Sequence, residues 1–243
     1  MISKNQIKFV KQLDQKKYRK RENVFVAEGP KVVGDLLTCG FVPHSIYATV
    51  DWQPSKNVSF QEVTDDELRK ISFLQHPQQV LGVFTIPSTE QTIIKDQLVL
   101  ALDGVQDPGN LGTIIRIADW FGIQDIFCSP DTADAWNPKV IQATMGSIAR
   151  VRITYTDLPA LIRQASVPVY GTLLDGNNIY EQKLSHNGII VMGNEGNGIS
   201  QEIRQLITHK LLIPDFHEGD SHAESLNVAI ATAITCSEFK RRG

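Results

Sequence analysis

Continuous hydrophobic runs alternate with amphipathic segments along the second half of the chain. Short apolar runs bounded by polar or glycine-containing stretches are typical of strands buried on both faces of a parallel sheet. Segments with apolar residues at helical spacing lie between these runs. The pattern predicts an α/β fold with strands at 98–103, 125–128, 169–174, 188–193 and 210–214, and helices at 111–121, 138–147, 157–165 and 199–207.

The first part of the chain alternates in the same way on a smaller scale. Thr64 and Glu67 form the spacing of a capping box at a helix N-terminus. Expected helices cover 5–13, 31–38 and 64–73, and expected strands cover 24–27, 45–48 and 80–84. A polar, proline-containing stretch at 86–97 predicts a linker. We therefore expect a small α/β sandwich at 1–88 and a larger α/β domain at 97–243.

The last predicted helix covers residues 225–241. Its apolar residues recur at the spacing of one helix face, which indicates a stripe turned toward a core. We expect the buried stripe to consist of Leu226, Ala229, Ile230, Ala233 and Ile234.

The net charge of −3 argues against a nucleic-acid-binding protein until it is divided along the chain. Residues 1–90 carry 12 Lys and Arg against 10 Asp and Glu, whereas residues 91–243 carry 12 against 17. A basic segment near the N-terminus can neutralise RNA phosphates even in an acidic chain. The alternative is a solvated helix face followed by a loop. The candidate RNA-binding residues are Lys16, Lys17, Arg19, Lys20 and Arg21.

Composition disfavours several classes of protein. No apolar run approaches the roughly 20 residues that a membrane-spanning helix needs, and the basic N-terminus lacks the apolar block of a signal peptide. Cys39, Cys128 and Cys236 form no CxxC pattern, so neither a disulfide framework nor a zinc site is expected. These observations predict a cytoplasmic protein with no membrane partner and no metal.

Three loops at the ends of predicted strands have unusual chemistry, and in parallel α/β sheets such loops bind ligands. The first, DGVQDPGNLGTIIR at 103–116, holds three glycines within nine residues. Asn110 is a candidate helix N-cap, and Arg116 can reach back from the helix toward the loop. A capped helix with a surface arginine explains Asn110 but not the density of glycines.

The second loop, GNEGNGIS at 193–200, directly follows a predicted strand. Its glycines have the order GxxGxG, the reverse of the dinucleotide fingerprint, and no GxxxxGK[ST] phosphate loop is present. Glycines let the backbone approach a flat ligand closely, and Glu195 adds one carboxylate. We interpret this loop as a ligand site rather than as a structural turn.

The third loop, IPDFHEGDSHAESLN at 213–227, precedes the last helix. The histidines and acids between Asp215 and Glu224 match no common zinc spacing, so a polar loop is favoured over a metal site. Ser225 and Asn227 can each be simple helix caps. No GxSxG elbow is present either. The residues alone thus indicate an α/β enzyme that holds a nucleotide-like ligand in glycine-rich loops.

In this order the loops resemble the three motifs of the SpoU branch of the SPOUT methyltransferases, also called the TrmH family. LDGVQDPGNLGTIIRIADWFG resembles motif one, VMGNEGNGIS motif two and IPDFHEGDSHAESLNVAIATAI motif three. The likeness spans most of residues 98–241. More loosely, residues 4–85 resemble the substrate-binding domain, similar to ribosomal protein L30e, that often precedes this catalytic domain.

The resemblance implies a parallel sheet with a C-terminal trefoil knot and a homodimer whose sites are completed near the partner's motif-one helix. It also implies methyl transfer from S-adenosylmethionine to a ribose 2′-hydroxyl of tRNA or rRNA. The residues that match the motifs' polar positions, and that form the expected catalytic set, are Asn110, Arg116, Glu195, Ser225 and Asn227. The residues expected to bind the cofactor are Gly193, Asn194, Gly198, Ile213, Leu226 and Asn227.

The loop from Pro214 to Ser225 is longer and more acidic than the usual form of motif three, so its contacts are expected to differ. A guanidinium is effectively always protonated. The resemblance implies that the motif-one arginine, Arg116, acts as general base. Because of its permanent charge we favour the alternative, in which Arg116 lowers the effective pKa of the ribose hydroxyl and holds the adjacent phosphate, with the proton lost late or to water; the choice between the two roles stays open.

Two other classes of protein remain as alternatives. A non-catalytic RNA-binding or ribosome-assembly protein could retain this fold, although the complete set of polar motif residues argues against it. The order of the glycines disfavours a nicotinamide-dependent oxidoreductase. Binding of S-adenosylmethionine or of NAD would separate the three, and both tRNA and rRNA stay open as targets.

Overall fold

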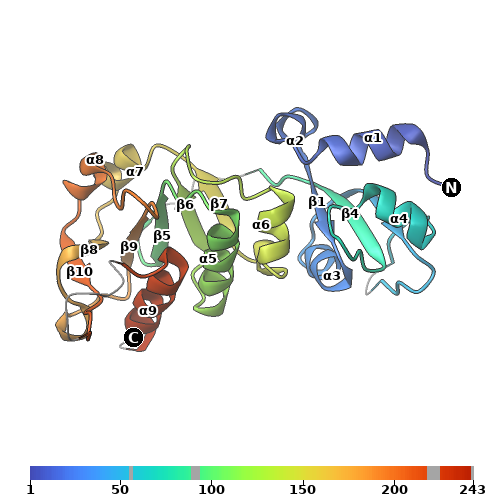
Figure 1. Ribbon diagram of the computed structural model, residues 1–243. Coiled ribbons are helices and arrows are strands. Elements are labelled where there is room, and N and C mark those ends of the chain that lie inside the picture. Colours follow the sequence, from blue (N-terminus) through green and yellow to red (C-terminus); the bar gives the residue numbers. More distant parts are fainter. Residues whose placement is uncertain (55–56, 89–93, 218–224, 242–243) are drawn as a thin grey trace. The chain divides into compact units, whose positions relative to one another are not determined.

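A computed structural model describes residues 1–54, 57–88, 94–217 and 225–241, and the chain divides into two compact units (Figure 1). Unit 1 comprises Met1–Ser88 and Asp134–Arg150, and unit 2 comprises Thr89–Ala133 and Val151–Gly243. The segment 134–150 therefore belongs to unit 1, although in sequence it interrupts unit 2. We call it the inserted segment.

Unit 1 is built around a four-stranded sheet in the order β1-β4-β2-β3, in which β4 is antiparallel to both β1 and β2. The Thr64–Glu67 capping box is confirmed at the start of α4. The strands are β1 (Val24–Glu28), β2 (Pro43–Ala48), β3 (Gln61–Glu62) and β4 (Val80–Thr85). The helices are α1 (Lys4–Gln12), α2 (Lys16–Glu22), α3 (Pro30–Thr38), α4 (Asp65–Ile71) and, from the inserted segment, α6 (Pro138–Ala143) and the 3₁₀ turn η1 (Ser147–Ala149).

Helices cover both faces of this sheet because successive strand residues point to opposite sides. Val26 and Val83 pack in the core that α1 and α4 complete. On the other face, the ring of Phe25 lies 5.9 Å from that of Phe84 and 4.7 Å from that of Trp136. Trp136 comes from the inserted segment, which thereby helps to close the core of unit 1.

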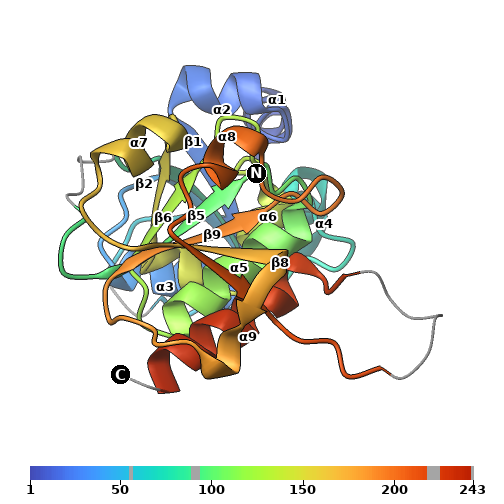
Figure 2. The ribbon, with the colours of Figure 1, turned by 90° about the vertical axis from the view of Figure 1, so that its left-hand side faces the viewer.

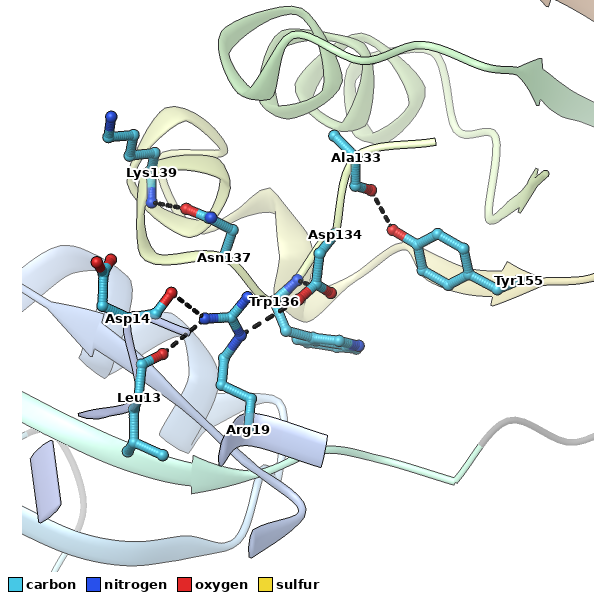
Figure 3. A network of polar contacts seen from close by, with 9 residues as sticks. All are labelled: Leu13, Asp14, Arg19, Ala133, Asp134, Trp136, Asn137, Lys139 and Tyr155. Carbon is cyan, nitrogen blue, oxygen red and sulfur yellow. Dashed lines mark hydrogen bonds and ion pairs between the residues drawn. The ribbon is translucent and has the colours of Figure 1, made fainter. Parts of the chain in front are cut away.

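Arg19 is a buried charge that fastens α2 to the inserted segment (Figure 3). Its side chain is 2% exposed. The guanidinium donates to the carbonyls of Leu13 at 2.6 Å and Asp14 at 2.7 Å, and pairs with Asp134 at 2.5 Å. A buried guanidinium requires such partners because desolvating an unpaired charge is costly. The prediction that Arg19 binds RNA is therefore wrong, since its donors are used within unit 1.

Unit 2 contains a six-stranded sheet in the order β10-β8-β9-β5-β6-β7, with parallel pairing between all neighbours. The predicted parallel α/β fold is confirmed.

In the described part of the chain, no helix has the length and apolar character needed to cross a bilayer. The strands are β5 (Leu98–Asp103), β6 (Asp125–Cys128), β7 (Arg152–Tyr155), β8 (Val169–Asn178), β9 (Gly188–Gly193) and β10 (His209–Leu212). The helices are α5 (Pro108–Trp120), α7 (Leu158–Gln164), α8 (Gln201–Arg204) and α9 (Val228–Arg241), with a 3₁₀ turn η2 (Ile179–Glu181).

The two faces of this sheet are covered by different helix pairs. Val99 of β5 and Val191 of β9 belong to a core with Ile162 of α7 and Ile203 of α8. On the opposite face α9 packs against β9 and against α5, and Figure 2 shows α5 and α9 side by side. The loops at the carboxyl ends of β5, β9 and β10 are thus anchored on a sheet that is buried on both sides.

The stripe predicted for the last helix is wrong at two positions. Leu226 and Ile230 are 49% and 52% exposed, whereas Ala229 is buried as expected. The buried face instead includes Thr232 and Thr235. Each threonine hydroxyl donates to the carbonyl four residues earlier, at 2.7 and 2.8 Å, which satisfies its hydrogen-bonding capacity without water.

Replacing Arg19 with alanine is expected to lower the free energy of unfolding of unit 1 by about 3 kcal/mol, because Asp134 is left without its cation. Urea denaturation followed by tryptophan fluorescence measures this, since Trp52 and Trp136 lie in unit 1 and the third tryptophan, Trp120 of unit 2, is already 85% exposed in the folded chain. Lys20→Ala on the same helix is the control and should cost less than about 0.5 kcal/mol. Equal losses in the two variants would contradict the structural role of Arg19.

Candidate active site

A pocket of about 640 Å³ lies in unit 2 at the carboxyl ends of β9 and β10 and beside the middle of β8. Such volumes are typical of small-molecule sites, which span about 300–1,000 Å³. The position is the one expected for ligands in a parallel α/β sheet. The segments that line it are 172–175, 192–199, 211–213 and 225–228, together with Arg204 and Ala231.

The structure brings the predicted cofactor residues together around this pocket. Glu195 and Ser225 of the predicted catalytic set line it as well, whereas Asn110 and Arg116 do not. Contact with a cofactor stays a prediction for each of these residues. The predicted cofactor residues that line the pocket are Gly193, Asn194, Gly198, Ile213, Leu226 and Asn227.

The glycine-rich loop after β9 is held in a tight turn. Backbone hydrogen bonds of 2.9 Å join Asn194 and Gly198 in both directions. The Asn194 side chain accepts from the N–H groups of Gly196 and Asn197, both at 2.9 Å, and donates to the Gly104 carbonyl at 2.7 Å. Its amide is therefore committed to shaping the loop and fastening it to the loop after β5.

Two glycines of this loop are required by its geometry. A Cβ at Gly193 would lie 2.3 Å from the carbonyl carbon of Gly198, and Gly198 itself has a φ of +68°. A side chain at Gly193 would collide with backbone, and one at Gly198 would be strained. These two glycines of the 193–200 loop are thus explained by a close backbone turn, and that turn lies beside the pocket.

A chain of side-chain hydrogen bonds joins the three motif loops. The Asn227 Oδ1 atom accepts from the N–H groups of Ala229 at 2.9 Å and Ile230 at 3.3 Å, so Asn227 caps α9. Its Nδ2 group donates to Asn110 Oδ1 at 2.9 Å, and Asn110 Nδ2 donates to Glu195 Oε1 at 3.0 Å. We call Asn227, Asn110 and Glu195 the polar relay. The helix cap fixes the direction of both amides, because Oδ1 of Asn227 is already used as an acceptor.

Asn110 can join the relay because another residue caps its helix. The N-cap of α5 is Asp107, whose side chain accepts from the Asn110 N–H at 2.8 Å, and Pro108 occupies the first helical position. The prediction of Asn110 as the N-cap is therefore wrong. Glu195 also accepts from the N–H groups of Gln106 and Asp107, both at 3.2 Å, and so fixes the entry to α5.

The Glu195 carboxylate is kept ionised by these donors. Partial burial by itself would raise the pKa of Glu195. Hydrogen bonds from Asn110 and from the backbone of Gln106 and Asp107 outweigh that effect, and the pKa lies below its usual value. A carboxylate with a lowered pKa is a weak general base at neutral pH. Glu195 is therefore suited to positioning the loops and not to accepting a proton.

Arg116 lies exposed on α5, and within the described ranges it makes no hydrogen bond or ion pair. Its guanidinium is free to bind an anion such as a phosphate. Ser225 is exposed at the entrance to α9 and has no hydrogen bond to the relay in the described part of the chain. Of the alternative metal ligands, Glu218, Asp220, His222 and Glu224 lie outside the described residues.

The structure also adds pocket residues that sequence reasoning missed. Residues 172–175 of β8 line one wall, and Asp175 forms ion pairs with Arg204 at 2.5 Å and Lys210 at 2.9 Å. There was little indication of this wall in the sequence beyond the residues DGNN at 175–178, which are of types common in turns and follow the predicted strand.

The pocket lies at the ends of parallel strands and is bordered by a glycine-rich turn. This arrangement is typical of α/β proteins that bind a small, nucleotide-like molecule. Residues 97–237 match the SpoU rRNA Methylase family, and residues 4–82 match the MRM3-like substrate binding domain. The chain belongs to the SpoU rRNA methylase family. The predicted family and enzyme class, an RNA methyltransferase, are confirmed.

Relatives of full length support this assignment. The chain is 32% identical over 241 residues to the 23S rRNA (guanosine(2553)-2′-O)-methyltransferase RlmP of Bacillus subtilis, covering 96% of this chain and 95% of the relative. The structure of a TrmH-family protein from Porphyromonas gingivalis superposes with a TM-score of 0.90 at 42% identity over the whole of both chains. An AdoMet-bound rRNA methyltransferase from Sinorhizobium meliloti gives a TM-score of 0.87 at 31% identity, covering 99% and 97%.

Glu195→Gln is expected to lower the melting temperature at neutral pH, because a neutral amide is a weaker acceptor for its three donors. The folded-state pKa of Glu195 lies below the unfolded value of about 4.3, so the carboxylate's contribution is complete above that pH. It is lost as the pH falls through the folded-state pKa. Thermal melts between pH 7 and pH 3 should therefore show that the difference in melting temperature between wild type and variant becomes smaller as the pH falls.

The matched control is Glu202→Gln on α8, which removes one negative charge from an exposed ion pair with Arg163. Such pairs contribute little to stability. If the difference in melting temperature between wild type and Glu195→Gln stays constant over the whole pH range, the loss of stability does not come from the charge of the carboxylate.

Proposed function

We propose that this chain methylates a ribose 2′-hydroxyl of ribosomal RNA. The methyl donor is S-adenosylmethionine. The observation that carries the proposal is the polar relay, which joins the three motif loops around one pocket. The preference for rRNA over tRNA is supported by relatives of nearly full length, whose names specify rRNA.

The pocket fits an adenosyl cofactor. Leu174, Ile213 and Leu226 offer apolar surface to the adenine, and the turn at Gly193 and Gly198 brings backbone groups close. When bound, the cofactor supplies a methyl group already activated by its sulfonium. These residues would hold it and leave the protein mainly the tasks of orientation and proton management.

The charges of the pocket disfavour a dinucleotide. Among the described residues that line it, the cation is Arg204, and this side chain is already paired with Asp175. A pyrophosphate would require backbone or cationic donors that face its oxygens. The lining therefore matches a ligand without phosphates better than NAD.

Arg116 is the residue we assign to activation of the ribose hydroxyl. Its guanidinium would bind the adjacent phosphate and lower the effective pKa of the hydroxyl. The hydroxyl oxygen would form a bond to the methyl carbon while the bond from that carbon to sulfur breaks, and the sulfur would leave as a neutral thioether. The proton leaves late or to water, because Glu195 is unsuited to accept it. Asn110, Glu195 and Asn227 orient the loops, and Ser225 lies at the pocket to orient substrate or cofactor.

RNA is bound by unit 1 in this proposal, as an L30e-like substrate-binding domain. Four of the five predicted basic residues remain candidates, since they are exposed on or beside α2. The cationic groups of Lys17 and Arg21 each lie 4.9 Å from the centre of the Tyr18 ring. Cationic side chains can bind RNA phosphates, and an aromatic ring beside them can stack on a base. The four candidates are Lys16, Lys17, Lys20 and Arg21.

The direct test is transfer of tritiated methyl groups from S-adenosylmethionine to separated, undermodified rRNA and tRNA, followed by nucleoside analysis. We expect label in a 2′-O-methyl nucleoside of rRNA. Arg116→Ala should reduce the rate by about 100-fold or more, as loss of one preorganised charge donor does elsewhere. Arg116→Lys should also be strongly impaired, because it keeps the charge but not the planar fork.

Arg163→Ala, which removes an exposed arginine outside the pocket lining, is the control and should retain full activity. Near-normal rates for Arg116→Lys would refute the need for a guanidinium. Label in tRNA alone would overturn the choice of substrate. Absence of both transfer and cofactor binding would favour the non-catalytic RNA-binding alternative.

We further propose a cytoplasmic homodimer that forms through α5 and α9. Trp120 of α5 and Ile230 of α9 are 85% and 52% exposed, and these two helices pack against each other, so their exposed apolar side chains offer a surface for a partner. Arg116 lies one turn before Trp120, on the same side of α5. A second copy covering this face would complete each site beside the partner's α5. We also propose that the C-terminal part of unit 2 forms the trefoil knot of the SPOUT fold; residues 218–224 of that part lie outside the described residues.

Ile230→Arg is expected to convert the protein from a dimer to a monomer, because it places a charge in the apolar contact. Static light scattering measures the mass, which should fall from twice 27.1 kDa to that of one chain. The residue is half exposed in the single chain, so the fold should survive. Val50→Arg, at a 71% exposed position of unit 1, is the control and should stay dimeric. A wild-type monomer would refute this interface.

A further inference from the structure

One wall of the pocket is a part of β8 that leaves the regular sheet. Tyr170 and Gly171 pair with His209 and Lys210 of β10, but the next β10 residue, Leu211, pairs with Asn177. Pairing of β8 with β9 also ends at Gly171. Residues 172–176 therefore form an excursion between two paired stretches of the same strand, and residues 172–175 line the pocket.

The excursion is anchored at both ends but exposed at its tip. Leu173 packs against the core beneath the sheet, whereas Leu174 is 76% exposed. At the far end, a Cβ on Gly176 would lie 2.5 Å from the carbonyl carbon of Leu211, so this glycine lets two backbones approach closely. An exposed leucine in the wall of a pocket is apolar surface that a ligand can cover.

Ion pairs hold the tip in place. Both Arg204, at the end of α8, and Lys210 of β10 contact the same Asp175 oxygen, at 2.5 and 2.9 Å. Hydrogen bonds from these cations keep the pKa of Asp175 below its usual value. With its carboxylate engaged by two cations of this chain, Asp175 is poorly placed to bind a ligand cation as well.

We propose that Asp175 is a positioning residue for cofactor binding, which acts by tethering the 172–176 excursion so that Leu174 forms an apolar wall for the adenosine part. The inference rests on the proposed function. A preformed wall reduces the ordering that binding requires and so increases affinity. Because the tether consists of partly exposed ion pairs, its contribution falls as salt concentration rises.

The test compares two ligands, S-adenosylmethionine and 5′-methylthioadenosine, by calorimetry on the full chain. The second ligand keeps the adenosine and thioether but lacks the amino-acid part and the positive sulfur. Asp175→Asn is expected to weaken both by the same factor, about fivefold, as loss of two exposed ion pairs allows. Asp175→Glu, which keeps the carboxylate, should recover most of the affinity.

Unchanged affinity for both ligands in Asp175→Asn would overturn the proposal. So would a loss confined to S-adenosylmethionine, because that pattern indicates direct contact with the ligand's charged part. Glu202→Gln, which breaks the other ion pair of α8 outside the pocket lining, is the matched control and should bind both ligands normally.

Leu174→Ala provides a second variant that does not touch the ion pairs. It is expected to weaken both ligands to a similar extent, and normal binding by this variant would also overturn the proposal. Failure of the wild-type chain to bind S-adenosylmethionine would instead overturn the proposed function itself. The two failures are therefore distinguishable in the same titrations.

Discussion

The amide of Asn110 is the point at which three segments distant in the sequence are joined. It accepts a hydrogen bond from Asn227, which caps α9, and donates one to Glu195, which holds the entry to α5. Only a side chain with both a donor and an acceptor can do this. An aspartate would present a second negative charge to Glu195 and offer no proton. Asn110 does not line the pocket itself, but it links two residues that do, Asn227 and Glu195.

The site separates the task of holding its shape from the task of chemistry. Asn194, Asn110 and Glu195 are committed to one another and to backbone groups, so they are poor candidates for proton transfer. Arg116 is the opposite case, a permanent charge without a partner in the described part of the chain. Methyl transfer from a sulfonium needs positioning more than acid–base catalysis. A pocket shaped by hydrogen bonds within the protein, together with the role proposed for Arg116, would meet that need.

Features that depend on a local pattern of residues could be predicted from the sequence, whereas features that depend on distant contacts could not. Strands such as 98–103 could be predicted because burial on both faces leaves a continuous apolar run. The candidate site residues were predicted because they lie in three recognisable motifs, and their roles stay a prediction. Arg19 and Lys20 are neighbouring basic residues that sequence alone does not distinguish. Arg19 is buried because it pairs with Asp134, which is distant in the sequence. The exposed Ile230 could not be predicted from helical spacing either, because the same stripe suits a core or an interface. Asp175 was missed because its partners, Arg204 and Lys210, lie on other elements.

The inserted segment gives the substrate-binding unit more than one covalent connection to the catalytic unit. Just before it, the Ala133 N–H donates to the Val105 carbonyl at 2.9 Å, in the loop that leads to Asn110. The next residue, Asp134, pairs with Arg19 of α2, beside the candidate RNA-binding lysines. Each contact lies within its own unit, and a single peptide bond joins the two residues. If α2 binds RNA as proposed, a change in this helix has a short route along the chain, through Asp134 and Ala133, to the first motif loop.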